Sequence, residues 1–226
     1  MSPSIPAPPP SARTTVKRQP GRGRYDRAAV HAVLDEGLVA HVGLVGDSGP
    51  VVIPMLYGRD GDRLLLHGSP ASRLMRGGST GLDMCVTVTL VDGLVLARSA
   101  FHHSMNYRSV VVFGRATLLT DRHEKLAALD RLVDHIVPGR GADVRPPSEK
   151  EVRATLVLAL PLDECSVKVR TGDPIDDDED LDLPVWAGVI PLTTVPGTPV
   201  PAADLAAGTP VPAHARTYAR PGTRAG

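Results

Sequence analysis

Aromatic side chains are scarce in this sequence. Phe, Trp and Tyr together make up 3% of its 226 residues, and Trp186 is the single tryptophan. The hydrophobic fraction of 42% is nevertheless ordinary for a globular protein, which excludes disorder along the whole chain. We therefore expect aliphatic side chains to fill the core of one domain of roughly 150–200 residues with tails.

Cysteine and an excess of charge of one sign are also lacking. The two cysteines, Cys85 and Cys165, have no motif spacing that would indicate a disulfide framework or a metal site. The formal net charge is zero, so the chain has no electrostatic footprint for nucleic acid or an anionic membrane. We expect neither of these as a partner.

Long hydrophobic runs are missing as well. No apolar stretch approaches the roughly 20 residues that a membrane helix needs. The N-terminus is rich in proline and serine and lacks the apolar stretch of a signal peptide. These absences predict a cytoplasmic protein.

Proline-rich segments lie at both ends of the chain. Residues 1–24 contain almost no large apolar residue, so they cannot offset their ordering entropy and are predicted to be a disordered tail. Residues 195–226 are rich in proline and alanine and are predicted to be a second tail without a packed element. The folded domain is expected at residues 25–194.

The pattern between the tails predicts a mainly β fold with a few helices. Asp26, Asp121 and Ser148 are expected to cap three helices. Asp60-Gly61 and Asp92-Gly93 are typical of tight hairpin turns. Seven or eight short strands favour a barrel or a sandwich, and we expect them near residues 38–45, 51–57, 64–66, 84–91, 94–97, 107–119, 156–160 and 165–169.

The segment from His67 to Arg73 has features of a phosphate site. It is predicted to open a short helix, with Ser69 as N-cap and Pro70 in the first turn. Free N–H groups at a helix N-terminus favour a phosphate, and Ser72 and Arg73 would add side-chain donors. An ordinary strand-to-helix connection with a solvated arginine explains the same pattern equally well.

Three further segments are candidates. Pro54 within a strand indicates an edge or a bulge, where backbone groups are free to meet a ligand. The polar residues 101–109 predict a pocket-lining loop or a solvated turn. Its neighbours His102 and His103 would point to opposite faces and have no third ligand, so we expect no metal site. A lone tryptophan such as Trp186 is more often a core residue.

In their order and spacing these segments resemble the pyridoxamine 5′-phosphate oxidase-related, FMN-binding family. The resemblance is closest to the branch that includes the nitroimidazole-resistance proteins, and it covers roughly residues 24–193. It rests on four motifs, namely Val-Val-Ile-Pro-Met-Leu-Tyr at 51–57, His-Gly-Ser-x-x-Ser-Arg at 67–73, Asn-Tyr-Arg-Ser-Val-Val-Val-Phe-Gly at 106–114 and Trp-Ala-Gly-Val-Ile-Pro at 186–191.

The resemblance implies a six-stranded split barrel that forms a homodimer, with two FMN sites across the interface. It implies that one strand meets the flavin ring and one turn binds the ribityl chain and phosphate, while the other subunit and a late aromatic complete the site. The corresponding residues are, in that order, Val52, Ile53, Pro54 and Met55; His67, Gly68, Ser69, Ser72 and Arg73; Arg108 and Ser109; and Trp186.

The resemblance also implies an FMN-dependent oxidoreductase that acts on a small molecule. Leu74 stands where the vitamin enzymes have a second basic residue, and their C-terminal Arg-and-His signature is missing, so pyridoxamine phosphate itself is not the expected substrate. His67, His102 and His103 are candidate proton donors, because imidazole titrates near neutral pH.

Two alternatives remain open at this point. One is a non-catalytic flavin-binding or redox-sensing protein. The other is a relative that uses a deazaflavin or haem on the same fold. Four histidines would be available to haem, but no motif singles one out: His41, His67, His102 and His103.

Overall fold

A computed structural model describes residues 7–46, 49–76 and 81–221, with the side chains of Arg73 and Arg76 outside the description. The chain forms two compact units. Unit 1 comprises residues 1–37, 87–112 and 164–193, and unit 2 comprises residues 38–86, 113–163 and 194–226. Each unit is described by itself below.

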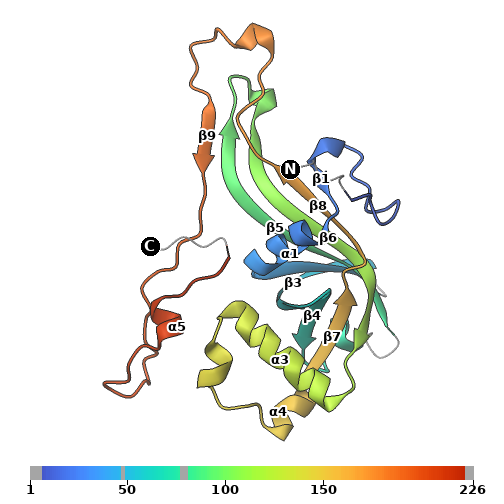
Figure 1. The fold of residues 1–226 in the computed structure, drawn as a ribbon, viewed down its shortest axis with the longest axis vertical. Helices are drawn as coiled ribbons and strands as arrows, with labels where there is room; N and C mark the ends of the chain where they lie inside the picture. Colours follow the sequence, from blue (N-terminus) through green and yellow to red (C-terminus); the bar gives the residue numbers. More distant parts are fainter. Residues whose placement is uncertain (1–6, 47–48, 77–80, 222–226) are drawn as a thin grey trace, which may run out of the picture. The chain divides into compact units, whose positions relative to one another are not determined.

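Nine strands account for most of the regular structure (Figure 1). They are hydrogen-bonded in the order β1-β8-β6-β7-β4-β3-β2-β5-β9, and β6 also pairs with β5. The six strands from β2 to β7 therefore form a closed ring, which confirms the predicted split barrel. The bounds are β1 Gly23–Arg24, β2 Val39–Gly46, β3 Gly49–Asp60, β4 Arg63–Gly68, β5 Leu82–Leu96, β6 Ser104–Leu118, β7 Leu156–Pro161, β8 Glu164–Arg170 and β9 Gly188–Pro191.

The helices begin where the capping signals predict. The side chain of Asp26 accepts a hydrogen bond from the backbone N–H of Ala29, and that of Asp121 accepts one from Glu124, both at 2.8 Å. Ser148 forms a full capping box with Glu151. The helices are α1 Arg27–Glu36, α2 Arg73–Arg76, α3 Arg122–Ile136, α4 Glu149–Ala154 and α5 Ala213–Arg216, with 3₁₀ turns η1 Pro20–Arg22, η3 Ala100–His102, η4 Arg140–Asp143 and η5 Asp178–Asp180.

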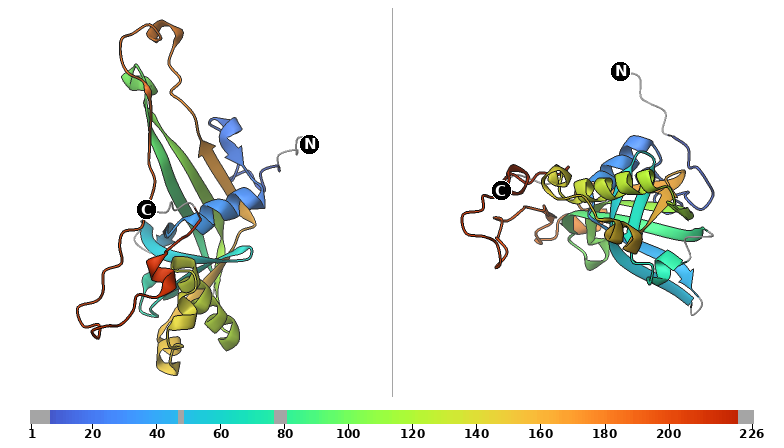
Figure 2. Two further views of the ribbon diagram at one scale, coloured as in Figure 1. Left: turned by 60° about the vertical axis from the view of Figure 1, so that its left-hand side comes forward. Right: turned by 90° about the horizontal axis from the view of Figure 1, so that it is seen from below.

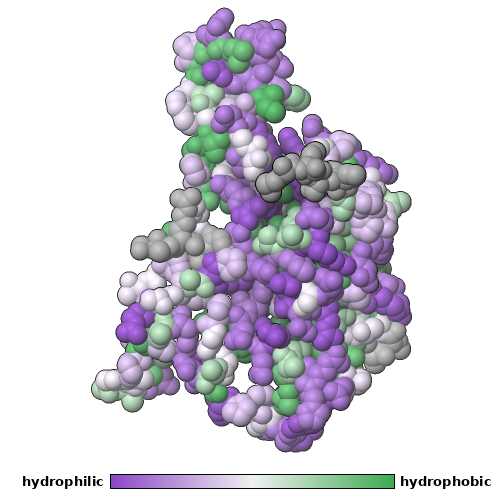
Figure 3. Space-filling model, viewed as in Figure 1, coloured by the Kyte–Doolittle hydropathy of each residue, from purple (hydrophilic) through white to green (hydrophobic). Residues whose placement is uncertain are grey.

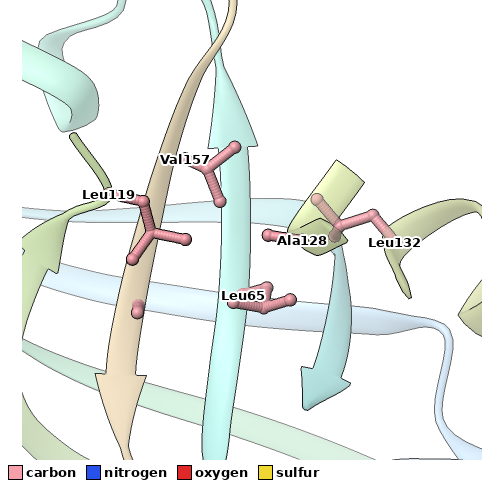
Figure 4. Packing of buried hydrophobic residues seen from close by; sticks show 6 residues of the cluster. Leu65, Leu119, Ala128, Leu132 and Val157 are labelled. Atoms are coloured by element: carbon pink, nitrogen blue, oxygen red, sulfur yellow. The ribbon is translucent and has the colours of Figure 1, made fainter. Parts of the chain in front are cut away.

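In unit 2, α3 packs against one face of the sheet. Strands β4 and β7 are antiparallel, with Leu65 opposite Ala159. Directly opposite residues share a face, and this face is buried under α3. The helix contributes Leu132, which is 3% exposed. Figure 4 shows the resulting apolar cluster, whose members are Leu65, Leu119, Ala128, Leu132, Val157 and Ala159.

In unit 1, β5 runs without interruption through Asp92-Gly93, so the predicted turn at this position is wrong. Gly93 pairs with Pro191 of β9 in an extended conformation. A Cβ atom at Gly93 would lie 3.0 Å from Cγ1 of Val189. The glycine therefore serves the close approach of a neighbouring strand rather than a tight turn.

The N-terminal segment is more ordered than its composition predicts. Thr14 is 2% exposed, and its hydroxyl donates to the carbonyl of Ser11 at 2.9 Å. The hydroxyl of Tyr25 accepts from the backbone N–H of Val16 at 2.9 Å. Strand β1 then pairs with β8. The predicted tail at 1–24 is thus wrong for residues 11–24, because hydrogen bonds replace the missing apolar burial; residues 1–6 lie outside the description.

The C-terminal segment also departs from its prediction. Most of residues 195–212 lacks regular structure, but α5 follows, and Figures 1 and 2 show it beside the end of α3 and η4. The hydroxyl of Tyr218 donates to the carbonyl of Ile136 at 2.8 Å, and Arg220 is 6% exposed. This tail therefore does carry a packed element. No helix in the described ranges is long and apolar enough to cross a membrane.

Candidate functional site

A pocket of about 650 Å³ lies in unit 2. This volume falls within the range of about 300–1,000 Å³ that is typical of small-molecule and cofactor sites. Strands β3 and β4, helix α3 and the segment from η4 to α4 form its walls. The lining residues are mostly apolar: Leu56, Leu129, Leu132, Val133, Ile136, Val144, Pro146 and Pro147, with Gly141, His67, Asp130, Arg145, Glu151 and Thr155.

His67 enters this pocket because of the register of β4. It stands two residues after Leu65 and opposite Val157, so its side chain shares the face that α3 covers. Its Nδ1 atom is buried without a hydrogen-bond partner in the described structure. Burial also lowers the pKa of His67, so the imidazole is neutral at neutral pH and keeps a nitrogen lone pair. A buried unpartnered nitrogen is costly, and it indicates a ligand-binding role.

Arg145 and Glu151 supply opposite charges to the pocket lining. The guanidinium donates from Nη1 to Oε2 at 2.8 Å and from Nη2 to Oε1 at 2.6 Å. Oε2 of Glu151 also accepts from the backbone N–H of Ser148 at 2.7 Å. The hydrogen bonds from Arg145, followed by those from Ser148, hold the pKa of Glu151 well below its usual range. The pocket thus combines apolar walls, a neutral imidazole and a charged rim.

This combination has a definite chemical character. Apolar walls favour a flat, largely hydrophobic ligand, and a small number of polar groups orient it. The lone pair of His67 suits a metal centre carried by such a ligand. Arg145 suits an acidic substituent. The described residues contain no cluster of three or more His, Cys, Asp or Glu side chains that would hold a free metal ion.

The strand at Val52–Met55 has the free edge that Pro54 predicts. Residues Gly49–Leu56 of β3 pair with β2, whereas β4 pairs only with Tyr57–Asp60. Among the described residues, the other edge of Gly49–Leu56 therefore has no strand beside it in the sheet order. Its backbone groups are available to a ligand, which is what the resemblance requires of Val52, Ile53, Pro54 and Met55, although their contact with a flavin stays a prediction.

The predicted phosphate segment forms a turn before its helix. The backbone N–H of Ser72 donates to the carbonyl of Ser69 at 2.9 Å, and that of Ala71 donates to the Ser69 hydroxyl at 3.2 Å. Helix α2 begins only at Arg73, so the assignment of Ser69 as its N-cap is wrong. The proline at position 70 lies within this turn instead. The side chain of Arg73 lies outside the description, and its phosphate contact stays a prediction.

Three predicted cofactor residues belong to unit 1. The guanidinium of Arg108 is directed at two carboxylates, with Nε and Nη2 on Asp92 at 2.9 and 2.6 Å and both Nη atoms on Glu36. These hydrogen bonds, those to Asp92 first, raise its pKa far above the usual value. Ser109 is half-buried in β6. The structure therefore shows a structural role for Arg108 and leaves its cofactor contact untested.

Trp186 is 66% exposed, which excludes the alternative of a core residue, and its predicted contact with the flavin stays a prediction. The ring lies over Gly188, where a Cβ atom would come within 2.9 Å of Cζ2. Other exposed apolar residues of unit 1 include Phe101 at 89% and Ile175 at 71%. Figure 3 shows hydrophobic residues on the upper end of its view, among hydrophilic ones. The predicted cofactor residues thus divide between the units, with 52–55, 67–69, 72 and 73 in unit 2 and 108, 109 and 186 in unit 1.

The polar stretch at 101–109 is held by local partners. Nε2 of His102 lies 3.0 Å from Oδ2 of Asp177, and Nδ1 of His103 lies 2.9 Å from the carbonyl of Ser99. Neither ring lines the pocket in unit 2. Of the three predicted proton donors, His67 is the one that lines this pocket, and the role of each as a proton donor stays a prediction.

The sequence did not identify the pocket wall that α3 and the segment from η4 to α4 form. The sequence predicts the helix that follows Asp121, but the periodicity of a helix does not distinguish residues that line a cavity from residues that fill a core. The cap expected at Ser148 predicts a helix at this point of the chain and assigns no pocket role to Glu151. Its pairing with Arg145 had no sequence signal, because the two residues belong to different structural segments.

Comparison with known proteins decides the family. The model of the family described as pyridoxamine 5′-phosphate oxidase matches residues 26–169. The chain belongs to this family. This confirms the resemblance found in the motifs, and no curated protein matches the sequence.

Solved structures place this family member near haem- and flavin-binding proteins. It is similar to the flavocytochrome Anf3 from Azotobacter vinelandii, with 44% identity and a TM-score of 0.86 over 91% of this chain and 96% of that one. It is similar to an FAD- and haem-binding protein from Mycobacterium smegmatis, with 43% identity and a TM-score of 0.83 over 86% and 96%. A putative 5-nitroimidazole antibiotic resistance protein from Bacteroides thetaiotaomicron is 26% identical, with a TM-score of 0.54 over 65% and 86%.

Proposed function

We propose that this family member is a flavocytochrome, an oxidoreductase that binds a flavin and a haem. Two relatives above 40% identity support this proposal, since one is a flavocytochrome and the other binds FAD and haem. The observation that carries it is the apolar pocket of unit 2 with the unpartnered, neutral His67. Of the alternatives that the sequence left open, haem is thus the one with a matching site.

The residues of the pocket fit a haem. Haem iron commonly takes a histidine as axial ligand, and a neutral imidazole provides the lone pair that it needs. His67 would hold the iron, the aliphatic residues of α3 that line the pocket would cover the macrocycle, and Arg145 would bind a propionate. When bound, haem supplies one-electron and oxygen chemistry, while the protein supplies orientation and a dry site.

The flavin is proposed to lie at the free edge of β3. The sequence resemblance implied FMN, whereas the Mycobacterium smegmatis relative binds FAD, so both nucleotides are tested below. The outward face of β2 and β3 supports a homodimer around this edge. It exposes a column of opposed, mostly apolar residues, namely Val39 with Leu56, His41 with Pro54, Gly43 with Val52 and Val45 with Pro50.

An absorption spectrum of the purified protein, before and after addition of haemin, tests the proposal. We expect flavin bands together with a Soret band, and chromatography of the released flavin identifies FAD, FMN or a deazaflavin. His67→Ala should abolish the Soret shift and leave the flavin content unchanged. His103→Ala is the matched control, because His103 lies outside the pocket. A protein that shows no Soret shift, or one that His67→Ala leaves intact, would contradict the haem assignment.

A further inference from the structure

Among the described residues that line the pocket, Arg145 is the only lysine or arginine. It directly precedes Pro146, which restricts the backbone of Arg145 to an extended conformation. Its Nη1 also donates to the carbonyl of Pro146 at 3.1 Å. The guanidinium thus has a defined position at the pocket, although its side chain is 70% exposed.

Glu151 would keep its position without Arg145. Its Oε2 accepts hydrogen bonds from the backbone N–H and the hydroxyl of Ser148 at 2.7 and 2.9 Å. Its own backbone N–H donates to the same hydroxyl at 3.4 Å, so the residue completes the cap of α4. Loss of the Arg145 partner would therefore leave the carboxylate hydrogen-bonded and exposed to water.

The bidentate Arg145–Glu151 pair has the geometry of an arginine that binds a ligand carboxylate. Exposed ion pairs contribute little to stability, because solvent screens both charges. An incoming carboxylate can therefore exchange with that of Glu151 at little cost. The side chain of Glu151 is also exposed, at 48%, and both residues line the same cavity.

We infer that Arg145 is the carboxylate-recognising residue of this pocket and that Glu151 occupies its guanidinium until a ligand carboxylate replaces it. The pair selects an apolar ring that carries an acid group over the same ring without one. For haem the acid group is a propionate, and in this respect the inference rests on the proposed function.

The proposed exchange predicts that substitutions of Arg145 and of Glu151 change the affinity for an acidic ligand in opposite directions. Removal of the guanidinium takes away the attraction for the ligand carboxylate. Glu151→Gln removes the competing charge but keeps an oxygen that can accept from Ser148, so α4 stays capped. Arg145→Gln should therefore weaken binding of an acidic ligand, and Glu151→Gln should strengthen it.

Titration of the haem-free protein with haemin and with haemin dimethyl ester, followed by the Soret band, tests the inference. Wild type should bind haemin at least about tenfold more tightly than the ester, since a charge-assisted hydrogen bond contributes about 1.5 kcal/mol at its low end. Arg145→Gln should remove this preference. Glu151→Gln should raise the affinity for haemin about two- to fivefold and leave the ester unchanged, in line with one exposed ion pair.

Arg122→Gln is the matched control, because Arg122 pairs with Glu149 outside the pocket lining. It should change neither affinity, and circular dichroism should show the same helix content in all variants. Equal binding of haemin and its ester to wild type, or an equal loss of both in Arg145→Gln, would overturn the inference. Failure of both porphyrins to bind would instead overturn the proposed function. In that case, calorimetric titration with dodecanoate and with its methyl ester tests carboxylate recognition alone. Equal binding heats for the two compounds would overturn the inference about Arg145.

Discussion

Arg108 joins three elements of unit 1, and its removal is a sharp test of the structure. Its guanidinium, on β6, makes four hydrogen bonds to Asp92 on β5 and Glu36 at the end of α1. The three side chains are 29%, 30% and 18% exposed. Arg108→Met would leave two carboxylates close together without a cation. We expect the free energy of unfolding to fall.

The exposed fractions of these three side chains limit the expected loss in the free energy of unfolding. Exposed ion pairs contribute about 0.2–1 kcal/mol each. Removal of one partner from a fully buried pair costs about 3–5 kcal/mol, because the other charge stays buried. The groups around Arg108 lie between these limits and two carboxylates lose their partner, so we expect a loss of about 2–3 kcal/mol.

Urea denaturation of wild type and Arg108→Met measures the loss. Arg108→Lys should recover part of it, since an ammonium keeps the charge but cannot bind both carboxylates in bidentate fashion. Arg115→Met is the control, because its pair with Asp83 is 55% and 81% exposed and should contribute little. Affinity for the flavin, measured where all variants are folded, should change less than about threefold. Full stability of Arg108→Met with a tenfold loss of flavin affinity would refute this reasoning and favour a cofactor contact.

Four further perturbations follow from the packing, each read by unfolding against wild type. Leu132→Ala should cost about 2–5 kcal/mol, because Leu132 is 3% exposed in the cluster under α3; a smaller loss would mean that α3 packs loosely. Burial lowers the pKa of His67 from 6.5, so the unfolded chain takes up this proton first as the pH falls. Wild type should thus lose stability below about pH 6.5, and His67→Phe should lose less; equal slopes would contradict this. Deletion of residues 213–226 should lower the thermal midpoint, since α5 and Tyr218 dock on unit 2, and an unchanged midpoint would show that they do not. Deletion of residues 1–22 should destabilise the protein because Thr14 is buried. Full stability of the truncated protein would instead support the prediction that this segment is a disordered tail.

Local signals in the sequence were reliable wherever neighbouring residues alone satisfy them. The N-caps at Asp26, Asp121 and Ser148 are all present, because a cap requires only a side-chain oxygen and a backbone N–H three residues later. The hairpin at Asp60-Gly61 is likewise present, with Gly61 at φ 55°. The free edge at Pro54 follows from the missing N–H group of proline.

Signals that depend on a distant partner were misread. Asp92-Gly93 has the composition of a turn, but β9 approaches the glycine and Arg108 binds the aspartate, so the strand continues. The first 24 residues have the composition of a disordered segment, yet residues 11–24 find hydrogen-bond partners in Tyr25 and β8. Composition indicates how much apolar surface a segment can bury. It does not indicate which polar groups the segment finds as hydrogen-bond partners.

The sequence by itself determined the family, the mainly β barrel and the residues that had to be considered for a cofactor, because these follow from motifs and local periodicity. Only the tertiary structure decided what those residues do. The register of β4 against β7 turns His67 toward α3, and the chain after η4 brings Arg145 and Glu151 to the same cavity. The same folding directs Arg108 to Glu36 and Asp92. The partners of His67 and Arg108 belong to elements far apart in the chain, and no local sequence pattern predicts these contacts.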